Sequence, residues 1–413
     1  MTTAELNQWY AAVPPEQNAA LILTNAFAHL VSVNTNTPNL PIIGRGRLPP
    51  RNEPLPPEMR QAIDDYVTTN QVALELLEKG LALKSCRYPV DLTPGWEALL
   101  PHLVGLKKSA QLLALKTLLD TETGAMSEAA ESLEKIMTLA DTVAKEPLLV
   151  SHLVRIACYQ MSYPCLERIL CRAPLRDSSL RRFSTLYRGM EASNGFERAI
   201  VADRCTGLQC FDYPIAQVNR VLADHGDYDP DDFGLAAAFW ILKVSGRWDL
   251  DELYFLSCLD DYSRAVKLPF PDRLEMADQV SNRIQQMKQK KYPYILSGMF
   301  LPGLGKAFDK DAAHIARLRA AEAALAVERY RLAHGDRLAE TLRAMAPDLS
   351  QELTTDPFDG EPLRYKPLGH GYAVYSVGPD TEDNGGAEEK PLSNAQRLAG
   401  ANEPSDITFT VER

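Results

Sequence analysis

The sequence predicts a mainly α fold, in which an irregular antiparallel, solenoid-like array of helices is followed by a small C-terminal α+β hairpin module. Through most of the 413 residues, apolar side chains recur at helical spacing. Short breaks containing Gly or Pro separate helical stretches of about 20 residues, which is typical of stacked helix hairpins. Clear period-two alternation, the pattern of a half-buried strand, is found near the C-terminus.

The first 57 residues predict an N-terminal helix and a Pro-rich extended segment. The segment from Asn34 to Pro57 contains Pro38, Pro41, Pro49, Pro50, Pro54, Pro56 and Pro57. Proline fixes φ and has no backbone N–H, so a run this rich in proline cannot continue a helix. We expect an extended loop that either wraps a surface or acts as a flexible linker.

Residues 58–310 predict the helical body, in which Gly124 separates two consecutive helices. The first helix carries an apolar stripe of Leu103, Leu106, Ala110, Leu113 and Leu119. The second carries Ala129, Leu133, Ile136, Met137, Ala140 and Ala144 at the spacing of one buried face. Pro147 fits the first turn of the helix that follows, where a missing N–H costs nothing. Pro214 and residues 225–233 predict a second break.

The apolar stretch from Tyr292 to Phe308 is an expected interruption of the helical body. It contains Pro293, Gly298, Pro302, Gly303 and Gly305, and we therefore do not expect a single helix. A buried connector to the C-terminal module is one interpretation. An exposed apolar patch for a protein partner is the other.

Residues 311–413 predict the α+β module, which begins with an Ala-rich helix from Asp311 to His334. One stripe of this helix holds Leu318, Leu325 and Leu332, and the charged residues, among them Arg319 and Glu328, lie elsewhere. Gly335 is a suitable terminator. A short second helix is expected from Leu338 to Met345.

A β-hairpin follows, since the chain changes here to turn and strand chemistry. Asp356-Pro357 and Asp359-Gly360 form a turn, because Pro357 presets φ and Gly360 tolerates a positive φ. Alternation from Leu363 to Lys366 predicts one strand, and Tyr372–Val377 predicts a stronger one. Ile407–Val411 alternates as well and predicts a third strand. We expect Tyr365 and Tyr375 on adjacent strands and the sheet packed against the preceding helix.

Residues from about 318 to 386 resemble the globular part of the major pseudopilin of type II secretion systems. The matching residues are Tyr330, Gly335, Asp356, Pro357, Gly360, Tyr365, Tyr375, Ser376, Gly378 and Asp380. The whole chain is similar to a group of uncharacterised bacterial proteins that join an Asn18-Ala19-Ala20 segment and a helical body to this module. We find no prepilin leader and no apolar N-terminal helix, so assembly into a pilus is not expected.

The resemblance implies calcium as an ion ligand, because the matching loop binds calcium in the pseudopilin family. Asp380 corresponds to the first aspartate of that loop and Asp406 to the aspartate before the final strand. Asp383 and Asn384 lie between them in sequence, and hard cations bind several oxygen ligands. The expected metal ligands are Asp380, Asp383 and Asp406. An ordinary solvated acidic loop is the alternative interpretation.

A second acidic run comprises Asp227, Asp229, Asp231 and Asp232. It is similar to the start of a calcium loop, but the glycine at the sixth position and the distant glutamate of that loop are absent. A loop that caps a helix near Phe233 is the alternative.

Composition limits the class of partner. The net charge of −11 argues against nucleic acid, because neutralising phosphates needs a basic surface. No stretch reaches the about 20 apolar residues that a membrane span requires. The seven cysteines are irregularly spaced and contain no CxxC motif, which predicts neither a disulfide framework nor zinc. Cys205 and Cys210 form a close pair for which a bridge or a metal remains an alternative.

We find no catalytic signature, so two functional classes remain. The first is a non-catalytic scaffold or protein-interaction protein, whose helical body offers a groove that the hairpin module caps, with an unidentified protein partner. The second is a hydrolase or other enzyme with a site in a cleft of the helical body. Apart from calcium, no cofactor is expected. The expected location is the cell envelope if an anchor or signal has been removed, and the cytoplasm otherwise.

Overall fold

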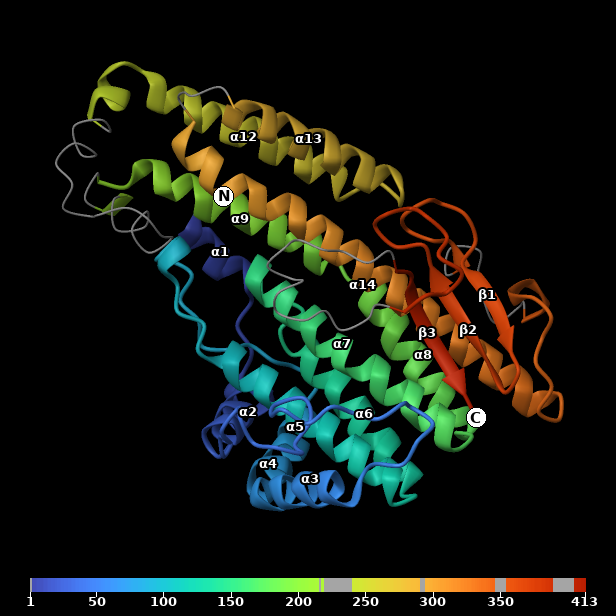
Figure 1. Ribbon diagram of the computed structural model, residues 1–413. Coiled ribbons are helices and arrows are strands. Elements are labelled where there is room, and N and C mark those ends of the chain that lie inside the picture. The colour runs from blue at the N-terminus through green and yellow to red at the C-terminus, as the bar shows by residue number, and fades with distance from the viewer. Residues whose placement is uncertain (1, 215–216, 219–239, 290–293, 346–353, 389–404) are drawn as a thin grey trace.

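The computed structural model shows a mainly helical protein with a small antiparallel sheet, which confirms the predicted fold class (Figure 1). The residues described are 2–214, 217–218, 240–289, 294–345, 354–388 and 405–413.

The helices follow one another as antiparallel neighbours along most of the chain. The N-terminal ones are α1 (Thr3–Trp9), α2 (Ala19–Ala28), α3 (Pro57–Thr69) and α4 (Gln71–Leu81). The central ones are α5 (His102–Glu122), α6 (Met126–Asp141), α7 (Leu149–Arg172), α8 (Asp177–Glu191) and α9 (Gly195–Asp212). The last ones are α12 (Arg247–Ala265), α13 (Asp272–Gln289) and α14 (Ile295–Ala333). Short 3₁₀ turns are η1 (Pro15–Gln17), η2 (Gly95–Glu97) and η3 (Leu342–Met345).

Helices α5, α6 and α7 confirm most of the periodic pattern. Leu106 and Leu113 of α5 and Leu133 and Ile136 of α6 are fully buried in one core. Gly124 lies in the short connection between α5 and α6 and has a φ of +78°, which a glycine adopts without strain. Ala144 lies beyond the end of α6 and is only half-buried.

The position expected for Pro147 was wrong. It precedes α7 and is not part of its first turn, because the extended backbone of Leu148 delays the start of the helix to Leu149.

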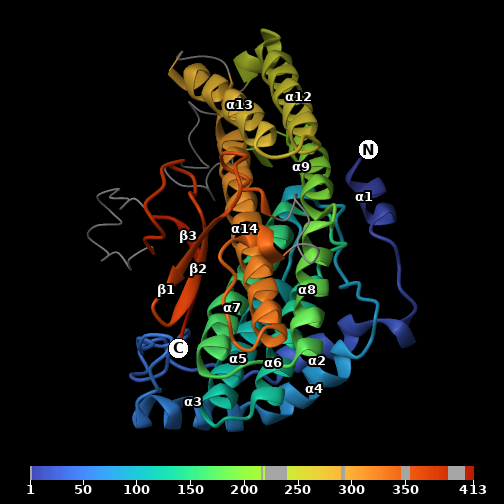
Figure 2. The same ribbon diagram turned by 90° about the vertical axis from the view of Figure 1, so that its right-hand side faces the viewer.

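The described apolar residues form two large cores, and helices α9 and α14 contribute side chains to both. One core holds α1, α2, α4–α8, part of α9, the second half of α14 and the sheet. The other holds α9, α12, α13 and the first half of α14. Figures 1 and 2 show α14 running along the molecule from the α12–α13 pair to the sheet. Helix α14 also runs through the boundary expected between residues 310 and 311, so the helical body and the C-terminal module share it.

The expectation that Tyr292–Phe308 would not form a single helix was wrong for the described residues, because α14 is continuous from Ile295 with Pro302 inside it. Asp251 of α12 explains the start. Its carboxylate accepts hydrogen bonds from the backbone N–H groups of Leu296 and Ser297, at 2.9 and 3.2 Å, and so supplies the missing N-terminal cap. Burial of the surrounding apolar face outweighs the lost N–H of Pro302.

The Pro-rich segment wraps the helices, as one of the two interpretations predicted. Leu40 and Leu55 are buried against α3 and α5 in a third apolar cluster. Arg168 of α7 donates to the backbone carbonyl of Glu53 at 2.6 Å, which fixes the segment on α7 as well.

The C-terminal sheet has three antiparallel strands in the order β1 (Arg364–Leu368), β2 (Gly371–Ser376) and β3 (Ile407–Glu412). Both the hairpin and the third strand are confirmed. Tyr365 is opposite Val374 and Arg364 is opposite Tyr375, so the two tyrosines lie on adjacent strands as expected. The expected second helix is only the 3₁₀ turn η3 at Leu342–Met345 within the described residues.

Asp356 organises the turns of this module. Its buried carboxylate accepts hydrogen bonds from the N–H groups of Phe358 and Val377, from the hydroxyl of Ser376 and from the guanidinium of Arg364, all between 2.8 and 3.0 Å. The preceding turn and both ends of the hairpin therefore depend on one side chain. Burial raises the pKa of Asp356, and the backbone donors oppose that rise.

The outer edge of β3 is closed by side chains of the helical body. Thr410 donates its N–H to Glu167 of α7 at 2.8 Å, and Glu412 donates its N–H to the Sγ of Cys171 at 3.2 Å. Arg51 donates to the carbonyl of Thr410 at 3.4 Å. An open strand edge invites pairing with another chain, so these contacts protect the sheet as well as position it.

The sheet packs on α14, as expected. The hydroxyl of Tyr372 donates to the carbonyl of Ala324 and contacts the carboxylate of Glu328, at 3.1 and 3.0 Å. Leu318 and Leu325 are buried, but Leu332 is 47% exposed, so the expected stripe was wrong in its last member. Leu332 lies in the last turn of α14, close to its end at Ala333.

The contrast between Leu325 and Leu332 gives a matched test of the packing. Leu325→Ala should lower the free energy of unfolding by about 2–5 kcal/mol, because it opens a cavity beneath the sheet. Leu332→Ala on the same helix should change it by less than about 0.5 kcal/mol. Urea denaturation of both variants checks this, and equal losses would contradict the packing described.

Candidate functional site

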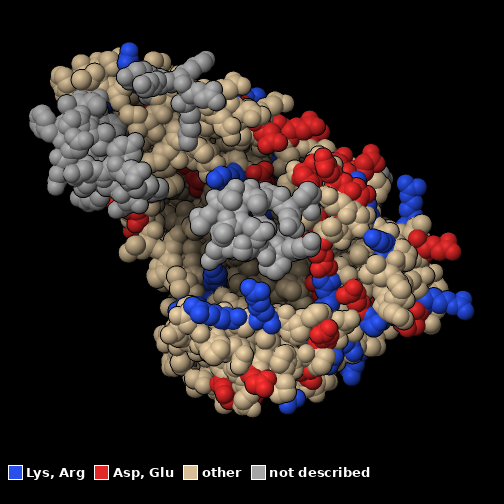
Figure 3. Space-filling model, in the orientation of Figure 1, with Lys and Arg blue, Asp and Glu red and all other residues tan. Residues whose placement is uncertain are grey.

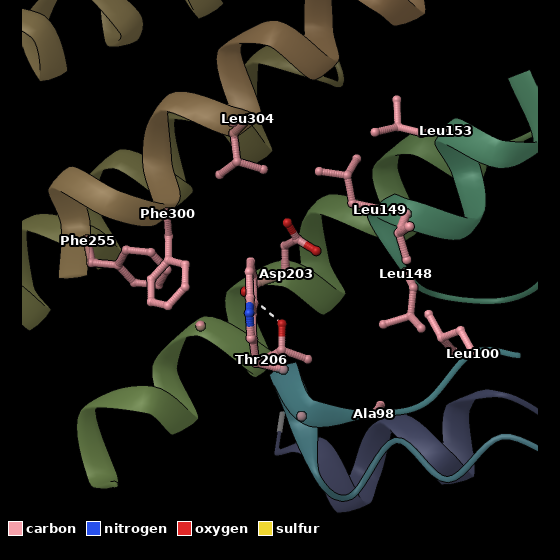
Figure 4. A pocket seen from close by; sticks show the side chains of 15 residues that line it. Ala98, Leu100, Leu148, Leu149, Leu153, Asp203, Thr206, Phe255, Phe300 and Leu304 are labelled. Atoms are coloured by element: carbon pink, nitrogen blue, oxygen red, sulfur yellow. Dashed lines mark hydrogen bonds between the residues drawn. The ribbon is translucent and has the colours of Figure 1, made fainter. Parts of the chain in front are cut away.

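An apolar cleft lies where the start of α7 meets α9, α12, α14 and the loop around η2 (Figure 4). Its volume is about 450 Å³, within the usual range of ligand pockets. Apolar side chains form most of its wall. The lining residues are Gly95, Trp96, Ala98, Leu100, Leu148, Leu149, Val150, Leu153, Asp203, Thr206, Gly207, Phe255, Phe300, Gly303 and Leu304.

The η2 loop is held against α9 by close contacts. Gly95 has a φ of +61°, and a Cβ there would lie 2.0 Å from the Oε1 of Gln209. Gln209 and Tyr213 donate to the carbonyls of Thr93 and Pro94, each at 3.2 Å. Only glycine permits this approach without a shift, so the loop that carries the next residue, Trp96, has a defined position.

Aromatic rings line one side of the cleft. The rings of Trp96 and Phe300 lie 4.5 Å apart between centroids, in a tilted arrangement. Phe255 packs against α9 at Gly207, where a Cβ would lie only 2.4 Å from its ring. Figure 4 shows Phe300, Phe255 and Leu304 facing Leu149 and Leu153 across the cleft.

Asp203 is the one titratable side chain among the described lining residues. It is half-buried on α9, and Figure 4 shows its carboxylate directed between Leu304 and Leu149. The carboxylate accepts the backbone N–H of Leu149, the first residue of α7. Burial raises the pKa of Asp203 to about 7, and the hydrogen bond from Leu149 opposes the rise. The neighbouring Arg204 pairs with Asp260 at 2.6 Å, and within the described chain no ion pair involves Asp203.

An exposed apolar rim borders the cleft. Trp96 is 39% exposed and Val150 is 47% exposed, and both line the cleft. Leu99, between the lining residues Ala98 and Leu100, is 83% exposed. Single exposed apolar residues are ordinary, but a group beside a cleft marks an interaction surface.

The Ser, His and Glu side chains that could take part in acid–base or nucleophilic chemistry lie in the core and not in the cleft. Glu146 accepts hydrogen bonds from Ser151 at 2.5 Å and Tyr10 at 3.3 Å, and His102 lies 3.2 Å from it. A Ser-His-acid triad needs the histidine between the other two groups, whereas here the carboxylate is in the middle. All four side chains are buried, so the cluster joins helices and the N-terminal segment.

A second buried cluster joins α7 and α14. His152 lies 3.0 Å from Asp311, and Arg273 lies 3.6 Å from the same carboxylate. His314 contacts the hydroxyl of Tyr163 at 3.3 Å, and burial lowers its pKa to about 3, which keeps the ring neutral. Both His152 and His314 are buried.

The expected metal ligands lie in the acidic loop after β2, at the end of the C-terminal module where Figure 3 shows Asp and Glu gathered. Asp406 accepts backbone N–H groups of Asn384 and Gly386 at 3.2 and 2.6 Å. Asp380 accepts the side-chain amide of Asn384 at 3.2 Å. Asp383 instead accepts the hydroxyl of Tyr375 at 3.2 Å.

Each of these three carboxylates faces a hydrogen-bond donor. The described residues contain no group of three or more His, Cys, Asp or Glu side chains arranged to hold a metal ion. Calcium binding stays a prediction of the pseudopilin resemblance, which a thermal melt with calcium and with chelator would test.

Other sequence predictions have varied outcomes. Asp227, Asp229, Asp231 and Asp232 lie outside the described residues. All seven cysteines are free, so the Cys205–Cys210 bridge is not formed. Among the described residues, none of those that line the cleft belongs to the hairpin module. Its position follows instead from the contacts of β3 with α7 and of Tyr372 with α14.

Comparison of the chain with protein-family models, curated proteins and solved structures found no match. Among the helices of the described residues, none is long and apolar enough to cross a membrane.

The raised pKa of Asp203 predicts a pH-dependent stability. The pKa of an aspartate in an unfolded chain is near its ordinary value of 3.8, and the pKa of the folded Asp203 is about 7, so between these values the folded state holds a proton that the unfolded state has lost. Stability should therefore fall as pH rises through this window. Asp203→Asn keeps an acceptor for the Leu149 N–H and removes the charge.

We expect the variant to be more stable than wild type by about 1–3 kcal/mol above pH 7, with little difference near pH 4. Urea denaturation of both proteins across this range measures the difference. A constant difference at all pH values would contradict the assignment. Glu167 and Glu322, whose pKa values are also raised to about 7, contribute equally to both proteins.

Proposed function

We propose that this chain is a non-catalytic scaffold or protein-interaction protein whose cleft between α7, α9 and α14 binds an apolar segment of a protein partner. The observation that carries the proposal is the continuity between the cleft and its exposed apolar rim of Trp96, Leu99 and Val150. A partner segment lying on this surface would cover the rim and place one side chain in the cleft.

The energetics support binding of this kind. Burying a large apolar side chain contributes about 1.5–3 kcal/mol, and a few such residues dominate most protein interfaces. The contact between the rings of Trp96 and Phe300 and the fixed η2 loop mean that the cleft wall is already ordered. Binding then costs less conformational entropy than it would at a loose surface.

The chemistry of the cleft also supports a binding role over the enzyme alternative. General acid–base or nucleophilic catalysis needs a second polar group close to the first. Besides Asp203, the described wall has polar groups only on Trp96, whose indole N–H is a donor and not a base, and on Thr206, whose hydroxyl donates to the backbone of its own helix at 3.2 Å. The polar clusters around Glu146 and Asp311 are engaged in contacts between helices.

The resemblance of residues 318–386 to the pseudopilin module adds two further parts to the proposal. One is a calcium-dependent acidic loop, and the other is a location at the cell envelope. Neither is needed for the binding role, because the residues described in the cleft and its rim all precede residue 311.

Short random peptides displayed on phage provide a test with the full chain. We expect wild type to select peptides with bulky apolar residues. Val150→Glu should weaken their binding by at least about tenfold, because it places a charge at the rim.

Val72→Glu is the matched control, since Val72 is 55% exposed on α4 and does not line the cleft. Its peptide affinity should equal that of wild type. Selected peptides that bind both variants as tightly as wild type would show that the cleft is not the binding surface, and selection of no peptide would contradict the proposal as a whole.

A further inference from the structure

The carboxylate of Asp203 is an unexpected polar group in a cleft with mostly apolar walls. It lies among Leu149, Leu304 and the aromatic side, where a charge is poorly solvated (Figure 4). A cleft meant only for apolar side chains would be better served by an apolar residue at this position. The described part of the chain places no cation beside it, since the adjacent Arg204 is paired with Asp260.

We infer that the partner segment inserts a lysine side chain into this cleft and that its ammonium group pairs with Asp203. The inference rests on the proposed binding function and names the chemistry that the cleft selects. It commits the occupant to a protein segment in which a lysine lies beside a bulky apolar residue.

The shape of the cleft fits both parts of a lysine side chain. Its aliphatic stem can lie along apolar walls while the charged end reaches a polar group. Leu149, Leu304 and Phe300 supply such walls, and the carboxylate of Asp203 is directed between the two leucines. The aromatic face formed by Trp96 and Phe300 also favours a cation over a neutral group.

A lysine side chain fits the cleft better than an arginine because the carboxylate of Asp203 offers few free acceptor oxygens. A guanidinium group is planar, carries five donors and binds best to a carboxylate whose two oxygens are both free. The carboxylate of Asp203 already accepts the N–H of Leu149. A compact ammonium group needs only one oxygen for a strong charge-assisted hydrogen bond.

The charge of the whole chain favours the same occupant. With a net charge of −11, the protein attracts basic segments over a distance, and such steering raises association rates at low salt. The cost of ionising Asp203 among apolar groups, which appears as its raised pKa, would be offset when an ammonium group enters.

A cycle of matched variants tests the inference. Peptides are selected on the wild-type chain, and each lysine beside an apolar residue is replaced by norleucine, which has a similar stem without the charge. For wild type, this change should weaken binding by at least about tenfold. For Asp203→Asn, which keeps the acceptor for Leu149, the same change should alter affinity by less than about twofold.

Failure of this inference and failure of the proposed function are distinguishable. Two results would overturn the lysine pairing and leave the binding function standing. One is a set of peptides that bind Val150→Glu more weakly but show no enrichment of lysine. The other is a norleucine effect of equal size on wild type and on Asp203→Asn. Peptides insensitive to Val150→Glu overturn the binding function. Because the lysine-to-norleucine change is made in the peptide, the wild-type arm remains decisive even if Asp203→Asn folds poorly.

Discussion

The structure depends on the continuity of α14, because this helix belongs to both large apolar cores. Its first half packs Leu301 and Phe308 with α12 and α13, and its second half packs Leu318 and Leu325 beneath the sheet and against the central helices. Asp251 fixes where the helix begins, and Glu328 fixes where the sheet contacts it through Tyr372 and Arg413. If α14 broke near Pro302, the two cores would lose the longer of the two helices that they share, and only α9 would still join them.

Charged side chains on α14 show why burial does not require an apolar sequence. Glu322 accepts a hydrogen bond from Ser184 at 2.9 Å, and Arg319 donates to Glu191 at 2.6 Å and to the carbonyl of Thr355 at 2.7 Å. The contacts with Ser184 and Glu191 join α14 to α8, and the contact with Thr355 joins it to the segment before the hairpin. A buried charge without its partner is strongly destabilising, so such pairs favour one arrangement of the helices over others.

Local chemistry made the fold class and the hairpin predictable from the sequence. The aromatic and β-branched residues of Tyr372–Val377 and the turn at Asp359-Gly360 are local signals, and both elements lie where expected. The beginning of α14 was not predictable, because its cap, Asp251, is 45 residues away from Leu296. Arg319 and Glu328 were expected away from the apolar stripe, yet both are buried, since their partners come from distant segments.

The candidate site was beyond sequence reasoning for the same reason. Asp203 is an ordinary charged residue in a helical pattern, and nothing near it in sequence indicates that Leu149 and Leu304 will surround it. The acidic loop illustrates the opposite case. Asp380 and Asp406 form a visible cluster in the sequence, but the structure engages both with N–H donors of the loop.

Native-state hydrogen exchange tests the central claim most directly, because it reports the free energy of opening of each buried amide. If α14 makes the helical body and the C-terminal module one cooperative unit, the amides of Val374 in β2, Leu113 in α5 and Phe308 in α14 should exchange with the same, global free energy. Exchange of Val374 at a free energy several kcal/mol below that of Leu113 would show that the sheet opens independently and would contradict the account.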